Sequence, residues 1–74
     1  MRGWRLYLRE ECHLCEALLA ELQLRGRLEA IELVDIDRDA ELALDYGLRI
    51  PVLRRMQDGR EWDWPFALDA VEGW

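Results

Sequence analysis

The chain has 74 residues, of which 51% are hydrophobic and 35% charged, and its formal net charge is −6. This length allows one small domain with a single core, and the composition argues against disorder. Sixteen acidic residues against ten basic ones disfavour nucleic acid as a partner. The sequence shows neither the roughly 20 apolar residues of a membrane span nor a signal peptide. We therefore expect one cytoplasmic domain over residues 1–74 that is monomeric and contacts no membrane.

A strand that leads into a helix is predicted near the N-terminus. Residues Trp4 to Leu8 alternate, so that Trp4, Leu6 and Leu8 share one face. From Cys12 to Arg25 the apolar residues recur at the spacing of a helix with one buried stripe. Gly26 suits the left-handed residue that ends such a helix.

The middle of the chain predicts a second strand and a short second helix. Ala30 to Ile36 is almost continuously apolar, which is typical of a central strand covered on both faces. Asp37 and Asp39 are candidate N-caps for a helix that runs through Tyr46. The inner face of this helix is expected to carry Ala40, Ala43 and Leu44, and Gly47 is expected to end it.

The last third of the chain predicts a hairpin and a closing helix. Val52 to Met56 is a third strand, Asp58-Gly59 is a two-residue turn signal, and Arg60 to Trp62 returns antiparallel. Pro65 suits the first turn of a helix that runs to about Val71. The predicted order is therefore βαβαββα, an α/β fold in which a four-stranded mixed sheet has helices on both faces.

Two cysteines, in the segment Cys12-His13-Leu14-Cys15, lie where the first strand passes into the first helix. The unpaired N–H groups and the dipole of a helix start stabilise a thiolate at Cys12. Cys15 lies one turn further on the same face, so the two sulfurs are able to close a small disulfide ring. In a reducing compartment, such a pair is more often catalytic or metal-binding than structural.

The segment from Leu6 to Cys15 resembles the first strand and CxxC motif of glutaredoxins. The segment Arg49-Ile50-Pro51-Val52-Leu53 resembles the one in which thioredoxin-fold proteins place a cis-proline beside their dithiol. This resemblance implies a minimal thioredoxin fold of the short, glutaredoxin-like form. It also implies an enzyme, a thiol-disulfide oxidoreductase in which Cys12 attacks and Cys15, the more buried thiol, resolves the mixed disulfide.

The same resemblance suggests which residues bind the substrate. A cis bond between Ile50 and Pro51 is expected to present the Ile50 backbone to a bound peptide; the alternative for Pro51 is a simple edge-strand or turn proline. Arg9 and Arg49 are expected to bind a carboxylate, although solvated arginines fit the sequence almost as well. Asp63 and Trp64 are expected at the same edge; the alternatives are a cap for the last helix and a packing residue like Trp62. His13 is either a proton shuttle or, the reading we favour, a surface residue that tunes the Cys12 thiolate.

No cofactor is required by this interpretation, and the partner is a disulfide-bearing protein or a glutathione mixed disulfide, with glutathione as one possible reductant. The paired glycines with which glutaredoxins help to seat glutathione are absent, and Trp62-Asp63-Trp64-Pro65 stands in their place. The alternative function is metal or iron-sulfur binding through the CxxC of two copies in a dimer, because two thiolates do not complete a closed site. A third possibility is a binding module whose dithiol is idle.

Overall fold

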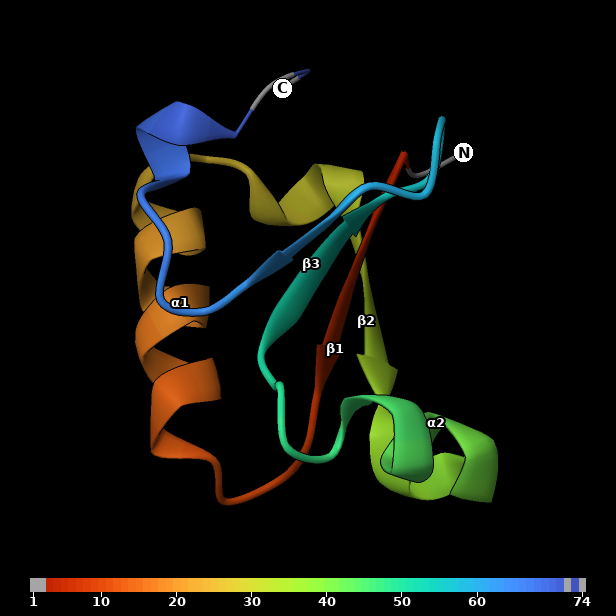
Figure 1. Cartoon of the computed structure of the whole chain (residues 1–74). Coiled ribbons are helices and arrows are strands. Elements are labelled where there is room, and N and C mark those ends of the chain that lie inside the picture. Colours follow the sequence, from red (N-terminus) through yellow and green to blue (C-terminus); the bar gives the residue numbers. More distant parts are fainter. Residues whose placement is uncertain (1–2, 72, 74) are drawn as a thin grey trace.

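The computed structural model describes residues 3–71 and 73 and contains a four-stranded mixed sheet with two α-helices (Figure 1). The sheet has the order β2-β1-β3-β4, with β2 parallel to β1 and the other pairs antiparallel. This arrangement confirms the predicted mixed sheet. Its elements are β1 (Trp4–Leu8), α1 (His13–Leu24), β2 (Ile31–Asp35), α2 (Ala40–Tyr46), β3 (Val52–Arg55) and β4 (Glu61–Asp63).

Each face of the sheet carries its own group of buried side chains. On the α1 face, Leu18 and Leu22 of the helix pack with Leu6 and Leu53 of the two central strands. On the α2 face, the core is formed by Tyr7, Ile36, Tyr46 and Val52. The alternation predicted for β1 is confirmed, because Trp4 and Leu6 belong to the first group and Tyr7 to the second. The two helices therefore lie on opposite faces, as expected.

Three connections gather at one end of the sheet. In the parallel pair, Leu8 of β1 lies opposite Asp35 of β2, so both strands finish at this end. In the antiparallel pair, Tyr7 lies opposite Val52, so β3 begins there. Residues 9–12, 36–39 and 48–51 consequently leave or enter the sheet side by side, and Figure 1 shows the first turn of α1 and the whole of α2 at this same lower end.

The prediction that the second strand is central was wrong. β2 is an edge strand that pairs with β1 alone, and β1 and β3 occupy the centre. Leu33 is 50% exposed, although it lies opposite the fully buried Leu6. An apolar run such as that of β2 is typical of a central strand. However, the position of a strand within a sheet depends on its pairing with distant segments, and this pairing cannot be predicted from the composition of the strand itself.

The predicted closing helix from Pro65 to Val71 was also wrong. The Trp64–Pro65 peptide bond is cis, and Ala67 is extended, with φ −79° and ψ 125°. In the part of this segment that the structure describes, the helical element is the 3-10 turn η3 (Leu68–Ala70). Leu68 and Val71 are both buried in the α1-face core, so this segment is held by two apolar anchors instead of by a regular helix. The observed order is βαβαββ followed by a single turn.

The hairpin turn is wider than the predicted two residues. Arg55 donates its backbone N–H to the carbonyl of Arg60 (2.8 Å), which leaves residues 56–59 as the loop. The expected turn residues still shape it: Gly59 adopts φ +75°, and the Asp58 carboxylate accepts the Arg60 N–H (3.1 Å) and pairs with the Arg55 guanidinium (2.7 Å).

Two residues were predicted as candidate N-caps of α2, and one of them is confirmed. Asp39 is the N-cap and accepts the Glu41 N–H (2.9 Å), whereas Asp37 is not a cap of α2. The expected inner position of Leu44 is wrong, since this side chain is 86% exposed. The inner face is set instead by Tyr46, which stacks on Tyr7 with the ring centroids 4.1 Å apart.

Candidate redox site

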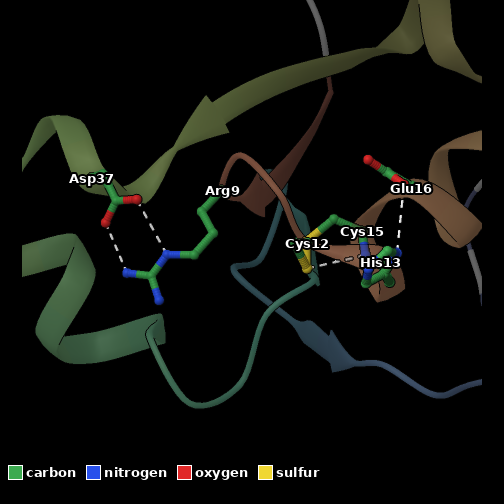
Figure 2. The surroundings of a disulfide bond; sticks show 6 residues. All are labelled: Arg9, Cys12, His13, Cys15, Glu16 and Asp37. Carbon is green, nitrogen blue, oxygen red and sulfur yellow. Dashed lines mark hydrogen bonds and ion pairs between the residues drawn. A yellow bond between two sulfur atoms is a disulfide. The ribbon is translucent and has the colours of Figure 1, made fainter.

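Cys12 and Cys15 form a disulfide at the start of α1, with their Cα atoms 5.2 Å apart (Figure 2). Cys12 is the N-cap: its backbone is extended, and its carbonyl accepts the first helical hydrogen bond from Glu16 (3.0 Å). Cys15 lies in the first turn and is 2% exposed, whereas Cys12 is partly exposed. The structure therefore leaves one cysteine partly exposed and buries the other, as predicted for an attacking and a resolving thiol.

The helix start supplies a donor to the exposed sulfur. The backbone N–H of Cys15 points to the Sγ atom of Cys12 at a distance of 3.2 Å. When the disulfide opens, this N–H and the positive end of the helix dipole are already placed to stabilise negative charge on Cys12. The site therefore has the local chemistry that a nucleophilic thiolate requires.

His13 is a surface residue. Its side chain is fully exposed, and Nδ1 lies 3.9 Å from Oε2 of Glu16, one turn along the helix (Figure 2). This position is compatible with a long-range electrostatic effect on the neighbouring thiolate. Nothing in the site holds the imidazole in a fixed geometry for proton transfer.

Arg9 points away from the disulfide and pairs with Asp37, as Figure 2 shows. Its Nη2 and Nε atoms donate to the two carboxylate oxygens of Asp37 at 2.7 and 3.1 Å. These hydrogen bonds lower the pKa of the Asp37 carboxyl. The guanidinium joins the loop after β1 to the turn after β2, and an incoming carboxylate would have to displace Asp37.

Ile50 and Pro51 lie in the segment that enters β3, at the same end of the sheet as the disulfide. The bond between them is cis, as the resemblance implied. Pro51 is buried, and its carbonyl accepts the Trp64 N–H (3.0 Å). Ile50 donates its own N–H to the carbonyl of Tyr46 (3.1 Å). The Ile50 N–H is therefore already hydrogen-bonded within the protein.

Arg49 is bound by two carboxylates of β4. It donates to both oxygens of Asp63 at 3.0 Å and to Glu61 at 2.6 Å. These contacts lower the pKa of Asp63, chiefly through the hydrogen bonds from Arg49. Asp63 was a candidate cap for the last helix; that alternative is wrong, because the described turn Leu68–Ala70 has Ala67 as its N-cap and the Asp63 carboxylate holds Arg49.

Tyr46 is a partner in this network that sequence reasoning did not predict. Its hydroxyl donates to Glu61 at 2.5 Å, and the Arg49 guanidinium lies 5.0 Å from the centre of its ring. Burial raises the pKa of Tyr46 to about 12, and the hydrogen bond to Glu61 adds to this effect. The sequence placed Tyr46 only at the end of the second helix, and its bond to a strand fifteen residues later depends on the tertiary fold.

Trp64 is partly buried and serves mainly as a packing residue. It lies edge-on to Phe66 with centroids 5.4 Å apart, and both rings pack partly buried against the α1-face core. Trp62 lies 6.0 Å from Trp4 and beneath the guanidinium of Arg60, at 4.7 Å. These contacts favour the packing interpretation of both tryptophans.

Two leucines at the end of the sheet that holds the disulfide are exposed. Leu14 was expected in the buried stripe of the first helix, which is wrong, and Leu48 was not predicted as a surface feature. Leu14, inside the CxxC, is 54% exposed, and Leu48, three residues before Pro51, is 104% exposed. Leu48 stands outside the helix and strand patterns, and an isolated apolar residue in a predicted loop was the available signal. Leu14, between the two cysteines in sequence, therefore adds an exposed apolar side chain to the CxxC segment.

Over residues 3–71 and 73, no three histidine, cysteine or carboxylate side chains lie together as a metal site would require. In the same part of the chain, no helix combines the length and hydropathy needed to cross a membrane.

The fold and the site define a class: a mixed four-stranded sheet with a CxxC at the first helix and a cis-proline at the same end is the arrangement of thioredoxin-like proteins. The model of the Glutaredoxin-like domain (DUF836) family matches residues 5–74. The chain belongs to this family, which together with the CxxC indicates a thioredoxin-like redox role.

Solved structures agree with this assignment. The crystal structure of protein XcR50 from X. campestris superposes with a TM-score of 0.74 at 49% identity, over 85% of this chain and 81% of that one. Protein Ne2328 from Nitrosomonas europaea, solved by NMR, has a TM-score of 0.67 at 33% identity, over 84% of this chain and 75% of that one. No curated protein matches the chain.

Proposed function

We propose that this protein is a thiol-disulfide oxidoreductase that acts through Cys12 and Cys15. The observation that carries the proposal is the asymmetric pair at the N-terminus of α1. Cys12, the N-cap, is partly exposed and its sulfur has a backbone donor at 3.2 Å, whereas Cys15, bonded to it, is buried. A structural disulfide gains nothing from this asymmetry, whereas a nucleophile and a resolving thiol require it.

The reaction transfers two electrons. The Cys12 thiolate attacks one sulfur of a partner disulfide, which forms the Cys12–partner bond and releases the other partner sulfur as a thiolate. Cys15 then loses its proton, attacks Sγ of Cys12 and closes the Cys12–Cys15 disulfide, releasing the second partner thiolate. A thiol such as glutathione, or a reductase, returns two electrons to the pair. A reducing compartment such as the cytoplasm suits this cycle.

The test is to trap the intermediate. Reduced Cys15→Ser protein is expected to form a stable mixed disulfide with bis(2-hydroxyethyl) disulfide, detected by intact mass. Cys12→Ser, the matched control, is expected to form none and to lose turnover, because the remaining thiol is buried. Full turnover in Cys12→Ser with loss in Cys15→Ser would reverse the two roles, and unreactive wild-type protein would refute the function.

The same preparation addresses metal or iron-sulfur binding by a dimer, which stays a prediction. Metal analysis and the molecular mass of anaerobically purified protein are the relevant measurements. Stoichiometric metal in a dimer without disulfide exchange would replace the proposed function.

A further inference from the structure

The negative charge of the chain is concentrated at the end of the sheet that holds the disulfide, hereafter the dithiol end, built from residues 9–16 and 35–50. These segments contain eight acidic residues and three arginines, a net charge of −5 out of −6 for the chain. The rest of the chain is nearly neutral. Because β1 and β2 are parallel and β3 begins where they finish, both segments lie at one end of the molecule (Figure 1).

Two of the three arginines of this end are already held by carboxylates. Arg9 is paired with Asp37, and Arg49 with Glu61 and Asp63. Glu10 and Glu11 immediately precede Cys12, are exposed, and have no ion-pair or hydrogen-bond partner among residues 3–71 and 73. A negatively charged thiol or disulfide that approaches Cys12 therefore meets uncompensated like charge.

The same end of the sheet also exposes two apolar side chains. Leu14 lies between the two cysteines in sequence, and Leu48 lies in the connection that enters β3; both are exposed. A partner of the right chemistry would place basic groups against the carboxylates and an apolar side chain against these leucines. Glutathione provides the opposite, since at neutral pH its carboxylates outnumber its ammonium group.

We propose that the dithiol exchanges with a protein thiol or disulfide set in a basic surface, and that glutathione is a poor partner. This inference rests on the exchange function proposed above. Each unit charge about 9 Å from the reacting sulfur changes the local concentration of a singly charged reactant roughly twofold in water. Several such charges give a large preference at low salt, which ionic screening then removes.

The experiment measures how fast thiols of different charge open the oxidised site. Three short blocked peptides carry one cysteine flanked by two arginines, two serines or two aspartates. The peptide thiolate attacks Sγ of Cys12, the Cys12–Cys15 bond breaks, and Cys15 leaves as a thiolate that takes a proton from water. Each rate is divided by that peptide's rate with neutral bis(2-hydroxyethyl) disulfide, which removes differences in intrinsic thiol reactivity.

At low salt, the arginine peptide is expected to react about tenfold or more faster than the aspartate peptide, with glutathione close to the latter. The ratio is expected to approach one in 1 M salt, where the screening length is about 3 Å. Equal normalised rates at every salt concentration would overturn the inference. If the oxidised protein reacts with no peptide and not with 2-mercaptoethanol either, the exchange function itself fails.

Two double variants test which carboxylates cause the preference for the arginine peptide. Glu10→Gln/Glu11→Gln is expected to reduce the arginine-to-aspartate ratio several-fold. Glu21→Gln/Glu29→Gln changes the net charge equally, but Glu21 lies about 13 Å further along α1 and Glu29 beyond the end of that helix. This second pair is expected to leave the ratio unchanged; an equal reduction would show that net charge, and not the dithiol end, sets the preference.

Discussion

Tyr46 connects the segment that carries Pro51 to the sheet. Its ring stacks on Tyr7, its carbonyl accepts the Ile50 N–H, and its hydroxyl donates to Glu61. Burial on its own raises the pKa of Glu61, but the hydrogen bonds from Tyr46 and Arg49 outweigh it, so the pKa of Glu61 is lowered. One aromatic residue thus fixes the start of β3 and keeps a half-buried carboxylate ionised.

Replacing this hydroxyl should change stability in a pH-dependent way. Tyr46→Phe is expected to lower the free energy of unfolding by about 2 kcal/mol at pH 7, because one hydrogen bond to a charged group is lost. The pKa of Tyr46 is raised to about 12, above the unfolded value of about 10, so its contribution is complete below pH 10 and is lost as the pH rises toward 12. Urea unfolding from pH 7 to 12 should show this alkaline loss in the wild type and a smaller one in Tyr46→Phe.

At the scale of elements, the α2 face of the sheet is only partly covered by a helix, and charged residues occupy the rest. Glu32, Arg5, Arg54 and Glu61 lie next to one another across β2, β1, β3 and β4. Arg5 pairs with Glu32 at 2.7 Å, and Arg54 with Glu61 at 3.4 Å. The two neighbouring arginines are each balanced by an outer glutamate, so this part of the face needs no covering element.

The end of α1 is determined by one glycine. Gly26 has φ +69°, and the Arg27 N–H donates to the Leu22 carbonyl (2.9 Å) while the Gly26 N–H donates to Gln23 (3.0 Å). This is the Schellman arrangement. By contrast, Gly47, the other predicted stop, has an ordinary φ of −53°.

Gly26→Ala is therefore expected to lower the free energy of unfolding by roughly 1 kcal/mol, because an L side chain is strained in the left-handed region. No neighbouring atom would obstruct the added methyl group, so the effect isolates backbone strain. Gly3→Ala, which has equal space and no positive φ, is the matched control. Denaturant unfolding of both variants makes the comparison, and equal costs would contradict this account.

At the scale of the whole molecule, several carboxylates contribute to stability through their arginine partners. The pKa values of Asp37 and Asp63 are lowered by Arg9 and Arg49, and hydrogen bonds from Arg55 lower the pKa of Asp58 to about 2. These contributions are complete above the unfolded value of about 4 and are lost as the pH falls through the folded values.

Thermal unfolding is accordingly expected to shift to lower temperature between about pH 4 and pH 2. Asp58→Asn, which retains an oxygen for the Arg60 N–H but loses the charge, should show a smaller shift over this range. An identical acid profile in the variant would mean that the Arg55–Asp58 pair contributes nothing.

Local patterns were sufficient for much of the fold and for the centre of the site. The CxxC at a strand-to-helix junction, the glycine that ends α1 and the Asp39 cap depend on residues within a few positions of one another, and the structure confirms all three. The mixed sheet followed from the order of these elements, and the cis-proline from the resemblance. Such features are encoded where they occur, because helix starts, caps and turns are satisfied by near neighbours.

The remaining features depend on strand pairing. β2 is an edge strand, Arg9 is bound to Asp37 and Arg49 to Asp63, and none of these follows from the residues adjacent to each. Packing of Leu68 and Val71, not helix propensity, determines the path of the last segment. The dithiol at a helix start is thus a property of the local sequence. The register of the sheet brings distant side chains together. It therefore decides which arginines near the dithiol are already paired with carboxylates, and it gathers the excess negative charge at that end.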